Sequence, residues 1–262
     1  MEKVRFWGLI ILLLVTGNLF GVNPSVVLET NFGNIVIELF YNEAPVTVDN
    51  FLGYVNSGFY DYLLFHRVVQ NNFFIVQGGA FYYYNNAIYY WDPDQPEIIN
   101  ESYNCLSNLR GTIAMARTNE PHSASSQFYI NTADNVMFDK INAADGYGYC
   151  VFGEVIEGMN VIDSIALLHT ATVPCYNFYL DDFPYPTLAG IYSAYVLPCD
   201  SPNCSNFNPD DDINFRDFAL FALQWMEDCD SSNSFCEQAD LDFSGKCNID
   251  DIVIFAGNWL NL

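Results

Sequence analysis

The apolar segments between Val26 and Leu197 are short, and this feature most limits what the chain can fold into. Each holds roughly four to eight residues between clusters of Gly, Pro, Asn, Asp or Ser, a pattern typical of β-strands joined by turns. Strands at this spacing, with few helices among them, predict a mainly β domain that forms a closed barrel or a sandwich. The predicted strands cover residues 26–30, 34–40, 65–69, 73–77, 112–116, 127–131, 150–155 and 191–197.

Two segments have helical spacing instead. Pro45 opens the first, apolar residues recur at helical intervals up to Val55, and Gly58 ends it. The second covers residues 159–168. With only two helices, the prediction of a mainly β domain stands.

The composition excludes several broad classes of protein. Hydrophobic residues make up 51% of the chain and charged residues only 15%, which excludes a disordered or collagen-like protein. The 32 acidic residues outnumber the eight basic ones, so that the formal net charge is −24. A field of this sign repels phosphate groups, and nucleic acid is therefore not expected as a partner.

The first 21 residues have the pattern of a secretory signal peptide. Lys3 and Arg5 precede an apolar run from Phe6 to Val15, and small or turn-forming residues follow as far as Gly21. The alternative is a transmembrane anchor, but the run is well short of the ~20 apolar residues that a span needs. The sequence therefore predicts export to a periplasm, the cell surface or the medium, with no membrane span after cleavage.

Eight cysteines in an exported chain predict disulfide bonds. Five of them lie after residue 198, where a small domain with little core would gain most from cross-links. Cys150 lies in the apolar run 149–152, where a buried free thiol is expected instead.

The last quarter of the chain contains a repeat. After a linker at 199–205, residues 214–225 align with residues 248–259 at a constant offset of 34 residues. In the second copy, oxygen-bearing side chains and a glycine have the spacing of an EF-hand calcium loop, although a merely solvated acidic run is the alternative. The predicted calcium ligands are Asp240, Asp242, Ser244, Lys246 through its carbonyl, Asn248 and Asp251, and in the first copy Asn206, Asn208, Asp210, Asn214 and Asp217, where Asp211 replaces the glycine.

Each of these loops runs directly into a helical pattern, and no helical pattern precedes it. A tandem loop–helix unit of this kind over residues 206–262 resembles a dockerin, whose two calcium-bound copies dock onto a cohesin-like receptor. The resemblance implies a small α-helical module, Ca²⁺ as its metal and a cohesin-like protein as its partner. Residues expected to face that partner differ between the copies, which argues against symmetric docking.

Arg67 is the most informative of the four basic residues between Val22 and Leu197. It follows Phe65 and His66 in a predicted strand and precedes an apolar run that ends in two glycines. A guanidinium among aromatic residues either pairs with a carboxylate as part of the structure or serves a ligand. The pattern alone leaves both interpretations open.

Five sequence blocks around Arg67 resemble the signature blocks of the cyclophilin-type peptidyl-prolyl cis-trans isomerases. Their order and approximate spacing match over residues 22–198, and the bacterial members are the most similar. The blocks are FHRVV at 65–69, FIVQGG at 74–79, GTIAMAR at 111–117, SSQFYI at 125–130 and YCVFG at 149–153.

The resemblance implies an eight-stranded antiparallel barrel capped by two helices, with the active site in a groove on its outer face and no cofactor for catalysis. It implies that Arg67 is the catalytic arginine, accompanied by Phe74 and Gln77. The substrate-binding positions that it implies are His66, Ile75, Ala116, Arg117, Gln127, Tyr129, Met137, Phe138 and Tyr149, with Ala116 and Arg117 acting through their backbones. Because bond rotation needs no general base, the residue types favour a structural or surface role for His66, His122 and His169.

The chain departs from the family's pattern in several places. Two extra residues lie between Arg67 and Phe74, so the loop that carries the pocket phenylalanine is expected to be rearranged. Tyr129 replaces the usual phenylalanine and would add a hydroxyl to the pocket edge. Met137 replaces the tryptophan of the drug-sensitive members, which predicts weak cyclosporin binding. Residues 81–91, rich in Tyr and Trp, form either a self-packed insertion or an aromatic wall beside the groove.

Together these features predict an exported peptidyl-prolyl isomerase that acts on proline-containing peptides or unfolded secreted proteins and assists their folding. A dockerin-like module would tether it. The alternative is a non-catalytic barrel that binds proline peptides and acts in extracellular assembly.

Overall fold

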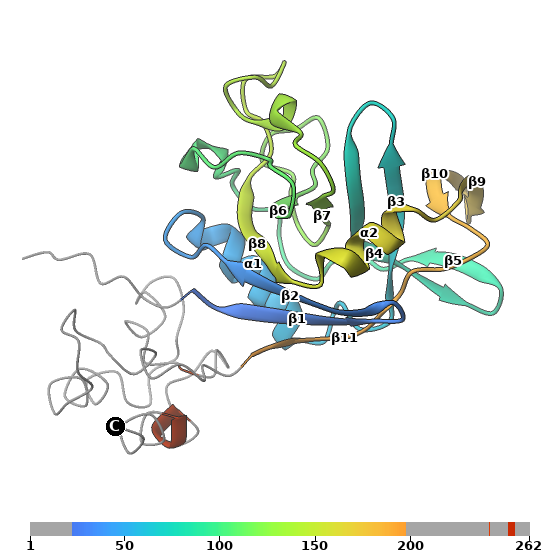
Figure 1. Cartoon of the computed structure of the whole chain (residues 1–262), viewed down its shortest axis with the longest axis horizontal. Coiled ribbons are helices and arrows are strands. Elements are labelled where there is room, and N and C mark those ends of the chain that lie inside the picture. Colours follow the sequence, from blue (N-terminus) through green and yellow to red (C-terminus); the bar gives the residue numbers. More distant parts are fainter. Residues whose placement is uncertain (1–22, 198–240, 242–250, 255–262) are drawn as a thin grey trace, which may run out of the picture.

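The computed structural model describes residues 23–197, 241 and 251–254, and its main feature is a curled antiparallel sheet (Figure 1). Eight strands follow one another in the order β11, β1, β2, β8, β6, β7, β4 and β3. Their bounds are β1 Ser25–Thr30, β2 Gly33–Leu39, β3 Leu63–Gln70, β4 Phe74–Tyr84, β6 Thr112–Met115, β7 Phe128–Asn131, β8 Val151–Glu157 and β11 Ile191–Val196.

The two ends of this sheet meet, which closes the curl. Leu64 of β3 forms a bridge with Gly190, directly before β11, and the Phe65 amide donates to the Ala189 carbonyl at 2.9 Å. The prediction of a mainly β, antiparallel eight-stranded fold is therefore confirmed. Every strand expected from the sequence is present, although β4 continues seven residues past its expected end at Gln77, to Tyr84.

Three further strands were not expected. β5 (Ala87–Tyr90) pairs with the far end of β4, and β9 (Thr170–Cys175) pairs with β10 (Phe178–Pro184) in a separate hairpin. The turn between β4 and β5 is formed by Asn85 and Asn86, both of which have positive φ. Two such residues between strands are typical of a type I′ hairpin turn, so these asparagines were a signal for the hairpin.

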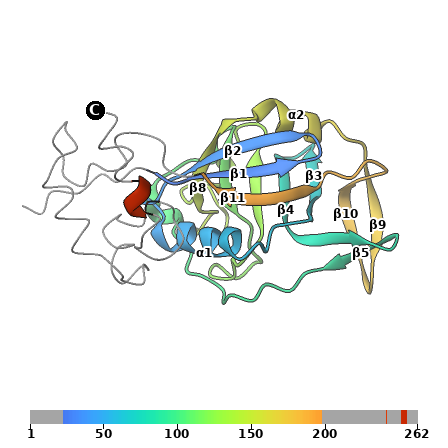
Figure 2. The same cartoon turned by 90° about the horizontal axis from the view of Figure 1, so that it is seen from below.

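The two expected helices are α1 (Pro45–Asn56) and α2 (Met159–Ala166), and short 3₁₀ turns cover η1 (Ser102–Asn104) and η2 (Val136–Phe138). Figure 2 shows α1 and α2 on opposite sides of the strands. The residue before α1, Ala44, has no side chain that could cap the helix. The buried carboxylate of Glu101 replaces that cap, because it accepts hydrogen bonds from the Val46 amide, the Thr47 amide and the Thr47 hydroxyl.

The main core lies inside the curl, and both helices pack against it. Its centre is aromatic, with Phe51 of α1 in ring contact with Phe128 and Phe152 from the sheet. Burying such large apolar side chains supplies most of the free energy that favours folding.

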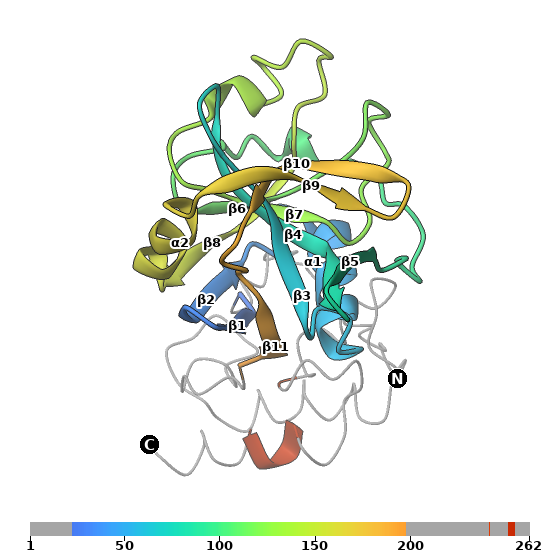
Figure 3. The ribbon, with the colours of Figure 1, turned by 90° about the vertical axis from the view of Figure 1, so that its right-hand side faces the viewer.

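A second apolar cluster joins the β4–β5 hairpin to the β9–β10 hairpin. Phe81 and Ile88 from the first hairpin pack with Val173, Cys175 and Phe183 from the second. Figure 3 shows the β9–β10 hairpin lying across β3 and β4. The aromatic segment 81–91 is therefore a strand pair with a packed inner side, while Tyr83, Tyr84 and Trp91 stay exposed.

The three cysteines in the described part of the chain, Cys105, Cys150 and Cys175, are free thiols. Cys150 is buried, as expected, and this burial raises the pKa of its thiol to about 12. The five other cysteines, the signal-like segment and the linker lie outside the described residues, so the predicted disulfides and the leader stay predictions.

The predicted calcium ligands also lie outside the described residues, with the exception of Asp251. Asp251 is buried, its carboxylate accepts a 2.6 Å hydrogen bond from the Leu241 amide, and residues 251–254 are helical. Within the described residues, no group of three or more His, Cys, Asp or Glu side chains could hold a metal ion. None of the helices there is long and apolar enough to cross a membrane.

Candidate active site

Arg67 is directed to the outer face of the sheet by an irregularity in β3. Phe65 pairs with Gly78 and Arg67 pairs with Gln77, so His66 has no partner on β4 and forms a β-bulge. The opposite strand supports this geometry through Gly79, whose φ of 96° suits glycine and where an added Cβ would lie 2.5 Å from the Ser126 carbonyl oxygen. The close approach of neighbouring atoms thus explains why glycines occupy positions 78 and 79.

An apolar cluster covers the same outer face, and we call it the outer-face cluster. Its buried members are Val69, Ile75, Ala114, Tyr129 and Val151. The partly buried residues that pack against it are Phe73, Leu106, Ala116, Phe138 and Tyr149. Ile75, Ala116, Tyr129, Phe138 and Tyr149 were all implied by the resemblance, and the fold brings them together.

Phe74 does not join this cluster, and Phe73 takes the place expected for it. Neighbouring residues of a strand point to opposite faces, so Phe74 lies on the other face from Ile75 and Gln77. Phe73 packs against Phe138 with ring centres 5.2 Å apart, and the Arg67 guanidinium lies 5.5 Å from the centre of the Phe73 ring. With two extra residues in the loop before it, Phe73 rather than Phe74 packs against the outer-face cluster.

Two glutamines lie at the edge of the outer-face cluster. Gln77 of β4 donates a 3.0 Å hydrogen bond from Nε2 to Oε1 of Gln127. The Gln127 carbonyl also accepts from the Ala116 amide, which fixes the segment that leads into β7. Both residues are half-buried.

His66 is not a member of the outer-face cluster, and the substrate-binding role that was implied for it stays a prediction. His66 is 3% exposed and its ring packs on Phe81, with the ring centres 4.6 Å apart. Burial is the main cause that lowers the pKa of His66 to about 3, with Arg67 adding to the effect. In the bulge the His66 ring lies against Phe81, and its low pKa keeps the ring neutral at neutral pH.

The side chain of Arg117 has a structural task that the sequence did not reveal. It is 4% exposed, and it donates to the Gly148 carbonyl from Nε and Nη2, pairs with Asp145 and lies 4.5 Å from the centre of the Tyr149 ring. Burial opposes ionisation of Asp145, but hydrogen bonds from Tyr147, Arg117 and Gly148 lower the pKa of its carboxyl to about 2. Arg117 thereby holds Tyr149 against the outer-face cluster.

The Tyr129 hydroxyl does not lie on the pocket edge. Tyr129 is 2% exposed, and its hydroxyl donates to the buried Asn108. Met137 lies on η2 beside Phe138 and is exposed, so it borders the cluster without packing into it.

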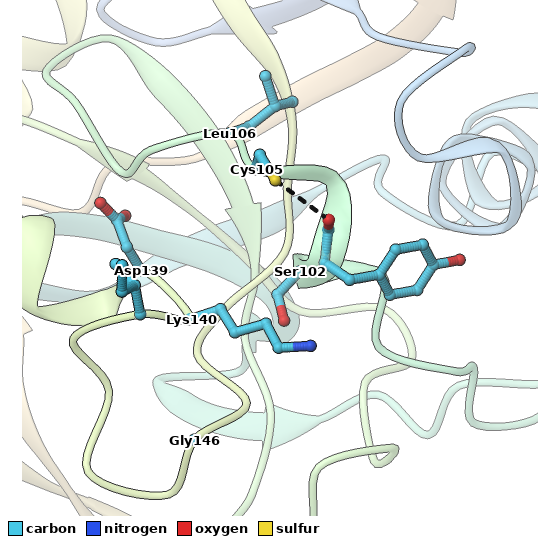
Figure 4. A pocket seen from close by; sticks show the side chains of 8 residues that line it. Ser102, Cys105, Leu106, Asp139, Lys140 and Gly146 are labelled. Atoms are coloured by element: carbon cyan, nitrogen blue, oxygen red, sulfur yellow. Dashed lines mark hydrogen bonds between the residues drawn. The ribbon is translucent and has the colours of Figure 1, made fainter.

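A pocket of about 530 Å³ lies next to the site, between η1 and the loop after η2 (Figure 4). Cys105 lines it and its thiol donates to the Tyr103 carbonyl at 3.5 Å, as the dashed line shows. No residue expected at the site lines this pocket. Its lining residues are Ser102, Tyr103, Cys105, Leu106, Asp139, Lys140, Ile141 and Gly146.

Comparisons with known proteins agree with this geometry. The family model described as "Cyclophilin type peptidyl-prolyl cis-trans isomerase/CLD" matches residues 25–185. A peptidyl-prolyl cis-trans isomerase of Acinetobacter baylyi is 48% identical over 150 residues, which cover 57% of this chain and 76% of the relative. Peptidyl-prolyl cis-trans isomerase B of Escherichia coli is 48% identical over 141 residues, which cover 53% of this chain and 82% of the relative.

The solved structures add evidence on the fold. A cyclophilin-type peptidyl-prolyl cis-trans isomerase of Cryptosporidium parvum superposes with a TM-score of 0.52 at 22% identity, covering 67% of this chain and 98% of that one. The family model, the bacterial relatives and the arrangement around Arg67 lead to one conclusion. The chain belongs to the family of cyclophilin-type peptidyl-prolyl cis-trans isomerases.

Proposed function

We propose that this chain catalyses cis–trans isomerisation of X-Pro peptide bonds at the outer-face cluster. The observation that carries the proposal is the position of Arg67. Its guanidinium lies over Phe73 on the outer face, and no described residue accepts a hydrogen bond from its Nη groups. An apolar, aromatic surface can bind the ring of a proline residue, and a charged donor with free N–H groups beside it can donate to the peptide bond of that proline.

The chemistry needs no covalent step. Rotation about an X-Pro bond removes amide resonance, against a barrier of ~18–20 kcal/mol for a peptide bond. As conjugation is lost, the lone pair localises on the prolyl nitrogen, and an N–H group of Arg67 can donate to it. This hydrogen bond is stronger in the twisted state than in the planar one, so it lowers the barrier.

The other residues of the site would hold the substrate. The apolar side chains of Phe73, Ile75 and Phe138 suit the pyrrolidine ring, and Gln77 and Gln127 suit the peptide groups on either side of it. Exclusion of water by the ring would strengthen the interaction between Arg67 and the prolyl nitrogen. Rotation about the bond transfers no proton, so the reaction needs no general base.

The test is a cis-to-trans exchange assay on a proline tetrapeptide with the wild type, Arg67→Ala and Arg110→Ala. Arg110 is a matched control, because it is an exposed arginine that pairs with Asp163 away from the cluster. We expect Arg67→Ala to lose most of kcat/KM and Arg110→Ala to keep it. If the wild type binds the peptide but does not accelerate exchange, the chain is a proline-peptide-binding barrel instead.

We also propose that the protein is exported, assists the folding of secreted proteins and is attached through a calcium-dependent C-terminal module. The signal-like pattern of residues 1–21 and the calcium-loop spacing at 240–251 support this. Cell fractionation should find the protein outside the cytoplasm. Mass spectrometry of the isolated protein should show that its N-terminus lies after the leader. Calorimetry on the full mature chain should detect Ca²⁺ binding that Asp240→Ala weakens, and a cohesin-like receptor should bind only with Ca²⁺ present.

A further inference from the structure

Arg67 has one acidic neighbour among the described residues, and that neighbour comes from a distant part of the chain. Oδ2 of Asp182, on β10, lies 3.7 Å from Nε of Arg67. This separation is longer than a hydrogen bond but within the range of an ion pair. The two side chains are 40% and 35% exposed, so both are open to solvent in part.

The backbone of β10 is shaped to present this carboxylate. Leu180 pairs with Val173 and Phe183 pairs with Ala171, so Asp181 and Asp182 together oppose Thr172 in a β-bulge. Asp182 adopts a φ of 55°, a left-handed conformation that Asp and Asn tolerate better than most residues. The two aspartates diverge as a result, since Asp181 accepts a 2.7 Å hydrogen bond from the Thr172 hydroxyl.

The hairpin that carries Asp182 is firmly attached at this place. Phe183, the next residue, is fully buried in the cluster that joins the hairpin to Leu64 and Phe81. Asp182 is therefore anchored on β10 next to β3, and its position is set by buried packing.

The guanidinium of Arg67 is held from two sides. Asp182 stands at the Nε edge, and the Phe73 ring lies 5.5 Å from the guanidinium carbon. No hydrogen-bond acceptor for the Nη groups is found in the described part of the chain. A partly exposed arginine without such contacts would sample many rotamers. The carboxylate restricts this freedom at one edge and leaves the other donors for a ligand.

We propose that Asp182 is a positioning residue for Arg67, an inference that rests on the isomerase function proposed above. The attraction between the two charges holds the Nη groups over the outer-face cluster before the substrate arrives. Preorganised donors stabilise a transition state more than mobile ones, because no reorientation is needed during the reaction. The apolar surface and the glutamines bind the ground state without Asp182, so its removal lowers kcat and leaves KM nearly unchanged.

The test compares Asp182→Asn with Asp181→Asn in the full mature chain. Both substitutions remove one negative charge from adjacent positions of the same bulge, but only Asp182 faces Arg67. Asparagine tolerates the left-handed backbone, so Asp182→Asn should fold, and Asp182→Gly provides a second variant without any strain at that φ. Exchange spectroscopy on a proline tetrapeptide gives kcat and KM separately, and thermal melting checks the fold.

We expect kcat to fall at least about fivefold in Asp182→Asn and in Asp182→Gly, with KM changed less than about twofold, and Asp181→Asn to match the wild type. The ¹⁵Nε–Hε resonance of Arg67, assigned by its loss in Arg67→Ala, should shift in both Asp182 variants and stay in place in Asp181→Asn. In the Arg67→Ala background, Asp182→Asn should have no further effect on kcat, because the two residues act through one group.

Two failures can be told apart. An inactive wild type contradicts the proposed isomerase function itself. If the wild type is active but Asp182→Asn and Asp181→Asn have the same kcat, the positioning role is overturned. The same holds if the Arg67 Nε resonance does not shift in the Asp182 variants, or if Asp182→Asn still lowers kcat in the Arg67→Ala background.

Discussion

The Tyr129 hydroxyl donates a 2.7 Å hydrogen bond to Oδ1 of Asn108, and both the tyrosine, a member of the outer-face cluster, and the asparagine are buried. Asn108 in turn donates from its backbone amide to Asp139, at 2.7 Å, and from Nδ2 to the same oxygen. Burial raises the pKa of Tyr129 well above its usual value, so the hydroxyl stays a donor. The tyrosine therefore ties the floor of the cluster to the loop after η2.

Replacing Tyr129 with phenylalanine tests this structural role. We expect Tyr129→Phe to lower the free energy of unfolding by about 1 kcal/mol, because the Asn108 oxygen loses its shortest hydrogen bond while the ring still fills its place. The kcat/KM for a proline peptide should stay within about threefold of the wild type, since the hydroxyl points away from the site. Urea unfolding and the exchange assay measure the two quantities, and a large loss of kcat with unchanged stability would contradict the assignment.

Phe73 and Phe74 form a natural pair for testing which phenylalanine serves the site. Phe73→Ala removes the ring that packs on Phe138 and lies beneath Arg67, so we expect kcat/KM to fall at least about tenfold. Phe74→Ala removes a ring that is 38% exposed on the other face of β4, and it should change kcat/KM less than about twofold. The reverse order of effects would show that Phe74 forms the pocket.

The buried His66 predicts that stability falls when the pH is lowered through the range from 6.5 to about 3. The folded protein keeps this ring neutral, because burial lowers its pKa to about 3, whereas the unfolded chain takes up a proton below pH 6.5. The unfolded state then binds more protons, so this residue contributes up to about 1.4 kcal/mol of destabilisation per pH unit within that window. Urea titrations at several pH values should show a flatter pH dependence of stability for His66→Gln than for the wild type, and an equal dependence in the two proteins would contradict the prediction.

Asp145 predicts a separate acid transition at lower pH. Its pKa is lowered from 3.8 to about 2 in the folded protein, so its contribution is complete above pH 4 and is lost as the pH falls toward 2. We expect Asp145→Asn to be less stable than the wild type at pH 7, because the buried Arg117 loses its charged partner, and the difference to shrink toward pH 2. Near-ultraviolet circular dichroism follows the packing of Tyr149 directly. A stability difference that stays constant from pH 7 to pH 2 would refute this account.

Much of the fold follows from local sequence patterns. Short apolar segments between clusters of turn-forming residues identified all eight strands of the main sheet. Pro45 and the helical spacing that follows it located α1. The hairpins were missed for a different reason in each case. The Asn85-Asn86 turn was hidden in an aromatic segment that read as an insertion, and the β9–β10 pair is largely exposed and lacks a clear alternation.

The family, the order of the five signature blocks along the chain and the role expected for Arg67 could all be inferred from the sequence, because they depend on residue types at fixed spacings along the chain. Three features could be seen only in the folded chain: Phe73 packs in the cluster in place of Phe74, His66 is buried, and Asp182 lies beside Arg67. These outcomes depend on strand register, on bulges and on the packing of a hairpin far along the chain. A shift of one residue in register moves a side chain to the other face of a sheet, and pairing between distant strands selects that register.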